Sequence, residues 1–416
     1  MSSSEGGSSS GSVARYGPTD RRYVSTLSGL RGLLALHVII IHFLMAFLPN
    51  TLTVFDAVLY PPSGDAHWMV KVVETPVVSL LVAGPFSLMI LFALSGYVLT
   101  MPFFDGRRER LGVSLWGRYF RLTIPIAGAI LFSLLLSRLG LYVNQDVAAI
   151  TNSGALAQLM PEAFLTPLNA VRDIAYNGLL SGLSFFNVVL WSIKYEFIGS
   201  IVVLAMFLVM PDRGRWIVIG ATCFLMAFYL EQGAIFVVTI VGGALLGYFP
   251  VPKRWRVPAL LVGLYLGGYI PGRFDYAWLP VLFENPGEQL FNVFFYNGFG
   301  AVLVVGAVIA GLGDRVLNTR IPQRLGDYSY SMYLLHLPIV CSLSCQIFLW
   351  LPRNDLSLLV NLAVYVTAVV ALASVYARYV DAPSIRLARR FGGWMTGIQR
   401  RERPVPAPAA TGAVGD

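Results

Sequence analysis

The chain has few charged residues and few cysteines for its length. Charged side chains make up 12% of its 416 residues, hydrophobic ones make up 56%, and the mean hydropathy is +0.68. This balance excludes a water-soluble domain of this size and indicates a polytopic membrane protein. The three cysteines, Cys223, Cys341 and Cys345, all lie in apolar runs and match neither a disulfide framework nor the spacing of a zinc site.

The two ends of the chain lack the hydrophobic pattern. Residues 1–22 are rich in Ser and Gly and contain no apolar signal-peptide core, so we expect a disordered tail there. Residues 391–416 are similarly low in complexity, and we expect them to be largely disordered as well. Between the tails we see neither an internal repeat nor a second soluble domain. We therefore predict one transmembrane domain over residues 23–390.

Apolar runs predict about ten transmembrane helices and an all-α fold. A helix needs roughly 17–25 residues to cross a bilayer. The fifth, sixth and seventh runs are shorter than the others, which leaves the count open by one or two. The ten runs lie near residues 28–48, 77–100, 122–141, 188–210, 216–230, 234–249, 257–273, 290–312, 328–350 and 357–380.

The net charge of +8 reflects an uneven distribution of basic residues between the two sides of the membrane. If the N-terminus is cytosolic, the cytosolic loops and tails hold 22 of the 30 Lys and Arg residues, and the opposite loops hold five. Such an excess is typical of cytosolic loops. It predicts that both termini are cytosolic, and it accounts for the charge without a nucleic-acid partner. Which membrane the protein occupies is left open.

The first span, "LRGLLALHVIIIHF", contains three ionisable residues. Arg31 and His42 are eleven residues apart, so in a helix they differ by only about 20° in direction and by roughly 16 Å along the axis. His37 lies about 120° away from Arg31, and we expect it to be hydrogen-bonded to a neighbouring helix. Two interpretations of Arg31 and His42 stay open. Either Arg31 snorkels toward the membrane surface and His42 is structural, or the two residues form a functional pair that faces a cavity.

Two later spans also contain ionisable residues. Glu196 in "LWSIKYEF" and His336 in "YSYSMYLLHLP" lie at depths near the midplane that overlap with His42. Ser192 and Tyr333 place hydroxyls on the same helix faces as these two residues. We therefore predict that His42, Glu196 and His336 converge on one polar cavity.

Arg118 and Arg121 lie three residues apart at the predicted cytosolic mouth of the third span. Their shared helix face suits a phosphate or pyrophosphate, although such residues also serve as topology signals or contacts to anionic lipid. No Walker-type or Rossmann glycine pattern accompanies them. Asp381, just beyond the tenth span, is expected to be a cytosolic helix cap or a partner of an arginine.

Six fragments, taken in order, resemble the integral-membrane acyltransferase 3 family over roughly residues 25–390. They are "LSGLRGLLALHVIIIHF", "FSLMILFALSGYVLT", "WGRYFRLTIP", "LWSIKYEF", "YSYSMYLLHLPIV" and "YVDAPSIRLARR". The resemblance implies a ten-helix enzyme that transfers an acyl group, usually acetyl, from acyl-CoA to a hydroxyl of a sugar or small molecule. Acyl-CoA is then a co-substrate, and no metal is expected.

The family motifs fall on particular residues of this chain. The Arg-x10-His pair corresponds to Arg31 and His42, the cytosolic Arg-x-x-Arg to Arg118 and Arg121, and the tryptophan–glutamate motif includes Glu196 and Trp191. The chain departs from the usual pattern at two positions. Ser28 replaces the common acidic residue of the first motif, and Lys194 precedes a single glutamate. These departures bear on acceptor binding more than on acyl transfer.

The resemblance and the residues together suggest a mechanism. A hydroxyl that attacks a thioester needs a base near neutrality, which we assign to His42, with Glu196 or His336 orienting it or binding the acceptor. Arg31, Arg118 and Arg121 would hold the phosphates of CoA. His336 or Tyr333 are candidates for oxyanion stabilisation. Direct transfer is simpler than an acyl-enzyme on Cys341 or Cys345, which lack a paired base.

A second class of function uses the same residues. In a proton-coupled secondary transporter, buried Arg, His and Glu side chains form a proton relay or counter-charges for the substrate. The absence of a two-fold hydropathy repeat argues against this alternative. A basic pair at one mouth also suits a phosphate-bearing donor better than a symmetric pathway.

Overall fold

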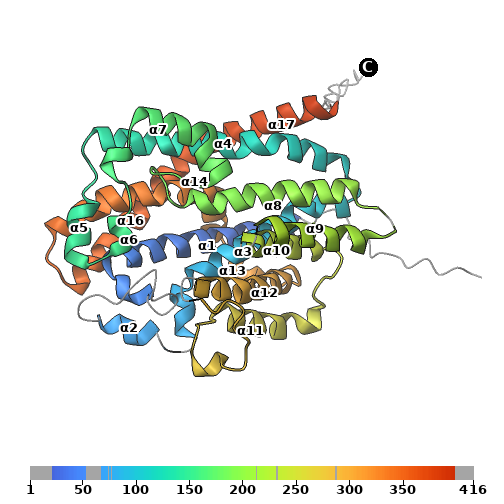
Figure 1. Ribbon diagram of the computed structural model, residues 1–416, viewed down its shortest axis with the longest axis horizontal. Coiled ribbons are helices and arrows are strands. Elements are labelled where there is room, and N and C mark those ends of the chain that lie inside the picture. The colour runs from blue at the N-terminus through green and yellow to red at the C-terminus, as the bar shows by residue number, and fades with distance from the viewer. Residues whose placement is uncertain are drawn as a thin grey trace, which may run out of the picture.

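Helices form the whole architecture of the described chain (Figure 1). The computed structural model describes residues 21–52, 67–73, 75, 77–211, 213–230, 233–285 and 288–398. Within these ranges there is no β-strand, which confirms the predicted all-α class. The predicted tails lie largely outside the described residues, and the last helix ends at Thr396.

Seven helical segments in the described ranges are long and apolar enough to cross a membrane. Each coincides with one of the predicted spans. The sixth continues from α14 through a π-helical turn, η9 (Val340–Ser344), into α15 (Cys345–Trp350), and the seventh continues from α16 through η10 (Ala377–Asp381) into α17 (Ala382–Thr396). The main helices are α1 (Arg21–Phe47), α3 (Gly84–Phe104), α4 (Glu109–Arg138), α8 (Leu190–Val209), α12 (Gln289–Ile309), α14 (Arg320–Ile339) and α16 (Asp355–Tyr376).

The three short predicted spans also form helices. They are α9 (Arg215–Leu230), α10 (Ala234–Leu245) and α11 (Arg256–Gly267). A helix of 12 residues, the length of α10 and of α11, rises only about 18 Å, less than the roughly 30 Å hydrocarbon core. The predicted count of ten spans therefore stays a prediction. α10 packs against α3, α8 and α12, so most of its surface contacts protein.

Short helices occupy the long connections between spans. α1 is followed by η1 (Pro49–Leu52), α2 (Trp68–Val73) and η2 (Val78–Val82). α2, α5 (Asn144–Thr151) and α6 (Gly154–Ala157) lie at the left of Figure 1, whereas the C-terminal end of α17 lies at the upper right. The connection from α4 to α8 contains α5 (Asn144–Thr151), α6 (Gly154–Ala157), η3 (Glu162–Phe164), α7 (Pro167–Arg172) and η4 (Asp173–Ser181).

Glycines allow α1 to pack directly against α14. A Cβ atom at Gly32 would lie 2.4 Å from the backbone nitrogen of Gly326, and one at Gly326 would lie 2.2 Å from the carbonyl oxygen of Ser28. Only glycine permits backbones to approach this closely, as is usual at helix crossings in membranes. This crossing explains the glycines around Arg31 in the first span. It also brings the first histidine-bearing helix alongside the one that carries His336.

A second close crossing joins α3 to α10. A Cβ atom at Gly96 would lie 1.8 Å from the carbonyl oxygen of Ile240, and one at Gly243 would lie 1.8 Å from that of Ala93. Gly96, which belongs to the fragment "FSLMILFALSGYVLT", therefore packs against a neighbouring backbone. The preceding residue, Ser95, faces the interior of the bundle instead, where it meets Glu196.

We expect Gly96→Ala to destabilise the bundle, because its Cβ meets a backbone carbonyl that no side-chain motion relieves. Overpacking of this kind costs about 1–3 kcal/mol. The measurement is the temperature at which half of the detergent-solubilised protein remains monodisperse. Gly220→Ala is the matched control, since nothing lies within 4 Å of a Cβ at that position in α9. Equal melting temperatures for the two variants would contradict the assigned crossing.

Candidate active site

Helix α1 places Arg31 and His42 in two different cavities. Arg31 lines a cavity of about 440 Å³, here called the polar chamber, and His42 lines one of about 390 Å³, here called the apolar chamber. Both face the interior of the bundle, as their eleven-residue spacing predicts. Leu88 and Tyr333 line both cavities, so the cavities adjoin at these two side chains, and this shared boundary is here called the partition.

Six Arg, Asp and Glu side chains of the described residues line the polar chamber. Three are guanidiniums and three are carboxylates, so their formal charges balance. Asp327 is solvent-exposed, whereas the others are partly or fully buried. The chamber lies between α1, α3, α4, α8, α14 and the junction of α16 with α17, and the six side chains are those of Arg31, Arg118, Arg121, Glu196, Asp327 and Asp381.

Arg118 and Glu196 form an ion pair inside this chamber. Ser95 donates a hydrogen bond of 2.6 Å to Oε1 of the same carboxylate, and Nε of Arg118 donates one of 2.7 Å to the hydroxyl of Ser200. α4 begins at Glu109, roughly 14 Å before Arg118 along the axis, so the arginine lies within the helix rather than at its first turn. The pair thus links α3, α4 and α8 through one charged cluster.

Arg121 forms a second ion pair, with Asp381. Its guanidinium also lies over the ring of Tyr330, 4.9 Å from the centroid. Of the two roles expected for Asp381, arginine partner and helix cap, the structure supports the first. This pair joins α4 to the start of α17 at one end of the chamber.

Arg31 differs from the other two arginines of the chamber. It makes no hydrogen bond and no salt bridge to any of the residues that the structure describes. The charges of Glu196, Arg118 and Arg121 all act on it across the cavity. Its guanidinium is therefore the cationic group of this chamber that is free to receive an anionic ligand.

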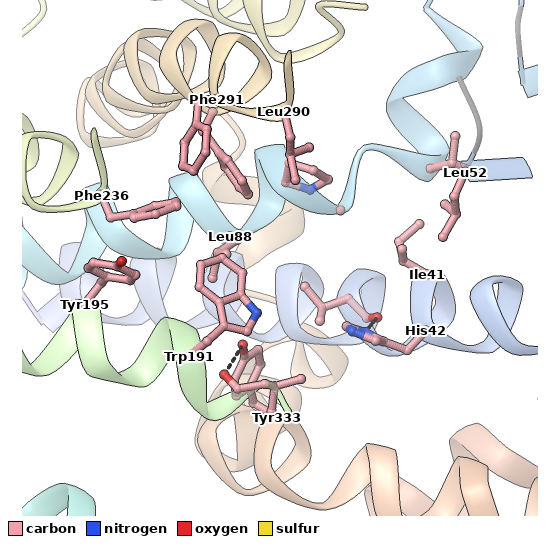
Figure 2. A pocket seen from close by; sticks show the side chains of 16 residues that line it. Ile41, His42, Leu52, Leu88, Trp191, Tyr195, Phe236, Leu290, Phe291 and Tyr333 are labelled. Carbon is pink, nitrogen blue, oxygen red and sulfur yellow. Dashed lines mark hydrogen bonds between the residues drawn. The ribbon is translucent and has the colours of Figure 1, made fainter. Parts of the chain in front are cut away.

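The apolar chamber has mainly aliphatic and aromatic walls (Figure 2). It lies between the second half of α1 and the first turns of α3, α8 and α12, with Phe236 of α10 and Tyr333 of α14 completing it. Trp191, Phe236 and Phe294 contact one another edge to face, with ring centroids 4.8–6.1 Å apart. Figure 2 shows the indole of Trp191 between the ring of Phe236 and His42.

The hydrogen bond of His42 determines which ring nitrogen carries the proton. Nδ1 lies 2.8 Å from the carbonyl oxygen of Val38, one turn earlier in α1. A carbonyl only accepts hydrogen bonds, so in the neutral ring Nδ1 donates and Nε2 keeps its lone pair. The described residues offer Nε2 no hydrogen-bond partner. The imidazole is thus oriented as a base toward the apolar chamber.

His336 packs directly against His42. The ring centroids are 4.7 Å apart, and Nδ1 of His336 lies 3.3 Å from the carbonyl oxygen of Met332. The ring is fully buried, and within the described residues its Nε2 has no hydrogen-bond partner. His336 lines neither chamber, so it meets ligands only through His42.

The partition is held by a cluster of hydroxyls. The hydroxyls of Tyr333 and Ser192 are 2.6 Å apart, and both lie within hydrogen-bond distance of the carbonyl oxygen of Val189. This cluster joins α8 to α14 between the two chambers. Its serine lines the polar chamber, whereas its tyrosine lines both.

The expectation for His37 is confirmed. Its ring bonds to the hydroxyl of Ser87 in α3 at 2.7 Å and to the carbonyl oxygen of Leu81 at 2.9 Å. Both nitrogens are thus engaged, and the residue lines neither chamber. Lys194, which differs from the family pattern, lies over the ring of Tyr195 at 5.3 Å.

The predicted single polar cavity is therefore divided. The structure brings His42 and His336 together, and it brings Arg31, Arg118, Arg121 and Glu196 together, but the two groups lie on opposite sides of Leu88 and Tyr333. Sequence reasoning missed the aromatic walls, because Phe236, Phe291 and Phe294 are typical of any buried span. No group of three metal-ligating side chains is found among the described residues.

The structure is that of an integral-membrane protein with an internal site. Its helices enclose a charged chamber and an apolar chamber that lie along the same helix. The family model described as an acyltransferase domain matches residues 24–378, which is most of the chain and nearly all of both chambers. The protein belongs to the acyltransferase 3 family and is a membrane acyltransferase. No curated protein and no solved structure matches it.

The contribution of the Arg118–Glu196 ion pair can be tested by measuring the stability of the protein. Removing one partner leaves an uncompensated buried charge, so we expect Glu196→Leu and Arg118→Met each to cost about 3–5 kcal/mol. The double variant should cost less than either single change. Thermal denaturation in detergent measures all three, with Asp355→Asn, which alters an exposed pair with His67, as the control. Additive losses in the double variant would argue against the pair.

Proposed function

We propose that the protein transfers an acyl group, acetyl in the simplest case, from acyl-CoA to a hydroxyl of a sugar or small-molecule acceptor. The observation that carries this proposal is the tautomer of His42, whose Nδ1 is engaged by Val38 so that Nε2 is a base at the cavity surface. Membership of an acyltransferase family supports the reaction class.

The polar chamber suits the phosphate-bearing donor. Arg31 offers a guanidinium with no carboxylate partner among the described residues, while the ion-paired Arg118 and Arg121 add positive groups whose geometry is fixed. Guanidiniums bind phosphate oxygens through two parallel hydrogen bonds. We assign the CoA phosphates to this chamber, with Arg31 as the principal contact. Glu196 then acts by holding Arg118 rather than by touching His42.

The proposed chemistry takes place at the partition. The thioester extends past Leu88 and Tyr333 toward His42, whose Nε2 accepts the proton of the acceptor hydroxyl as its oxygen attacks the carbonyl carbon. A C–O bond forms, the C–S bond breaks, and the proton held on His42 passes to the departing thiolate. The products are an ester and free CoA, and the imidazole returns to its neutral form.

An oxyanion forms in this reaction and needs a donor. Tyr333 is engaged with Ser192 and Val189, and His336 does not reach either chamber. The indole N–H of Trp191 lines the apolar chamber and has no acceptor among the described residues. We assign the oxyanion contact to this group. His336 is a positioning residue that supports the ring of His42.

Acyl transfer can be separated from the alternative, proton-coupled transport. The purified full-length protein is incubated with acetyl-CoA and a panel of sugars and lipophilic alcohols, and CoA release and ester mass are measured. Transfer to at least one alcohol is expected. Absence of CoA release with every acceptor, together with pH-driven solute flux in liposomes, would favour a transporter.

His42→Ala should reduce kcat for transfer by about 10²–10⁴-fold, the usual contribution of a general base. Expression and acetyl-CoA binding should not change, because the residue lies outside the polar chamber. His67→Ala is the control, since His67 lines neither chamber. Full activity of His42→Ala would remove the base assignment.

Arg31→Gln should raise KM for acetyl-CoA by about 10- to 100-fold, the loss of one hydrogen bond to a charged group at roughly 1.5–3 kcal/mol. Because the guanidinium has no internal partner among the described residues, protein stability should change little. Arg138→Gln, which alters an exposed arginine at the far end of α4, should leave KM unchanged. Steady-state kinetics measures both variants. An unchanged KM for Arg31→Gln would exclude Arg31 from the donor site.

A further inference from the structure

Among the residues that the structure describes, none that lines the apolar chamber carries a fixed charge. Its sixteen lining residues include no Asp, Glu, Lys or Arg, and the one titratable base among them is His42. The Arg, Asp and Glu side chains of the site lie in the polar chamber, beyond Leu88 and Tyr333. The two chambers therefore present very different surroundings to the two substrates.

The position of His42 determines which substrate occupies the apolar chamber. This residue lines the apolar chamber and not the polar one. A hydroxyl that gives its proton to Nε2 must lie beside that nitrogen, so the carbon skeleton bearing the hydroxyl extends into the same cavity. An acetyl group is too small to fill about 390 Å³, which lies near the lower end of the roughly 300–1,000 Å³ of small-molecule sites.

The chamber offers few polar groups to a ligand. Among the side chains of the described residues they are, besides His42, the indole N–H of Trp191 and the hydroxyls of Tyr195 and Tyr333, and the last is already bonded to Ser192. A sugar would bury several hydroxyls without partners here, which is unfavourable. The aromatic rings of Trp191, Phe236 and Phe294 instead provide a continuous apolar surface.

We infer that the acceptor is an uncharged lipophilic alcohol, whose single reacting hydroxyl meets His42 and whose hydrocarbon or aromatic body fills the apolar chamber. This inference rests on the proposed function and narrows its acceptor from the wider class of sugars and small molecules. The partition keeps the acceptor apart from the charged donor site.

Binding tests the inference without requiring transfer. The probe is 6-bromohexan-1-ol, whose bromine quenches tryptophan fluorescence on contact, added to the full-length protein in nanodiscs without acyl-CoA. Seven of the eight tryptophans are exposed and should show only linear quenching, whereas Trp191 lines the chamber. Saturable quenching is expected in the wild type and should be lost in Trp191→Phe. Retention of the saturable part in that variant would overturn the inference.

A pair of variants on α12 tests the shape of the chamber. Phe291 lines it, whereas Phe295, one turn later and similarly half-buried, packs against Tyr296 and Phe299 instead. In Phe291→Ala, kcat/KM for a bulkier alcohol relative to hexan-1-ol should rise by about 10-fold, since one methylene alone is worth 10–200-fold in an apolar pocket. Phe295→Ala should keep the wild-type preference, and KM for acetyl-CoA should be unchanged in both.

Three results would contradict the acceptor class while leaving acyl transfer intact. The first is acetylation of glucose as fast as hexan-1-ol. The second is equal rates for hexan-1-ol and 6-hydroxyhexanoate, its charged analogue. The third is a shift by Phe291→Ala in preferred acyl-CoA length rather than in preferred alcohol, which would assign the chamber to the acyl chain. Failure of the proposed function itself would differ, because no acceptor would then release CoA while saturable alcohol binding persists.

Discussion

The free energy of placing ionised groups among apolar helices governs the arrangement of this protein. An isolated guanidinium or carboxylate inside a bundle is costly, so such groups pair, face a cavity, or both. Arg118 and Arg121 do both, with Glu196 and Asp381 as their partners. The same two pairs tie α4 to α8 and to the start of α17. Charge neutralisation and helix assembly are thus served by the same contacts, and Arg31 remains as the arginine of the chamber with no ion-pair partner among the described residues.

The close helix crossings give these charges their positions. The crossing of α1 with α14 depends on glycines on both helices, and it brings His42 against His336. The crossing of α3 with α10 buries Gly96 and leaves Ser95 pointing at Glu196. Backbone contact at these two glycine-containing helix crossings therefore determines where the polar side chains of α1 and α3 lie.

Helical periodicity allowed part of this site to be predicted from the sequence. The shared direction of Arg31 and His42 follows from their spacing alone, and six ordered fragments were enough to identify the family. The pairing of Arg118 with Glu196 was not predictable in this way. It depends on how α4 packs against α8, and the two residues are separated by 78 positions. Depth along a helix likewise placed His42, Glu196 and His336 at one level, but it carries no information on the side chains of Leu88 and Tyr333 that stand between them.

The number of membrane-spanning helices is likewise only partly predictable from the sequence. Apolar length identified every one of the seven long segments, because each must satisfy its backbone within a helix of sufficient rise. It does not decide the role of α10, whose residues are as apolar as any span but are enclosed by α3, α8 and α12. An apolar run indicates that a helix is shielded from water. Neighbouring helices shield it as effectively as lipid does.

The thin partition at Leu88 and Tyr333 has an electrical consequence. The two cavities follow one another along α1, so these two side chains lie where a charged compartment meets an uncharged one. A unit charge that crosses the full membrane voltage changes in free energy by about 2.3 kcal/mol per 100 mV, and a charge that passes between the chambers experiences the share of that voltage that falls between them. Any step that carries net charge from one chamber to the other is then coupled to the energisation of the membrane, while a step that passes only neutral groups is not.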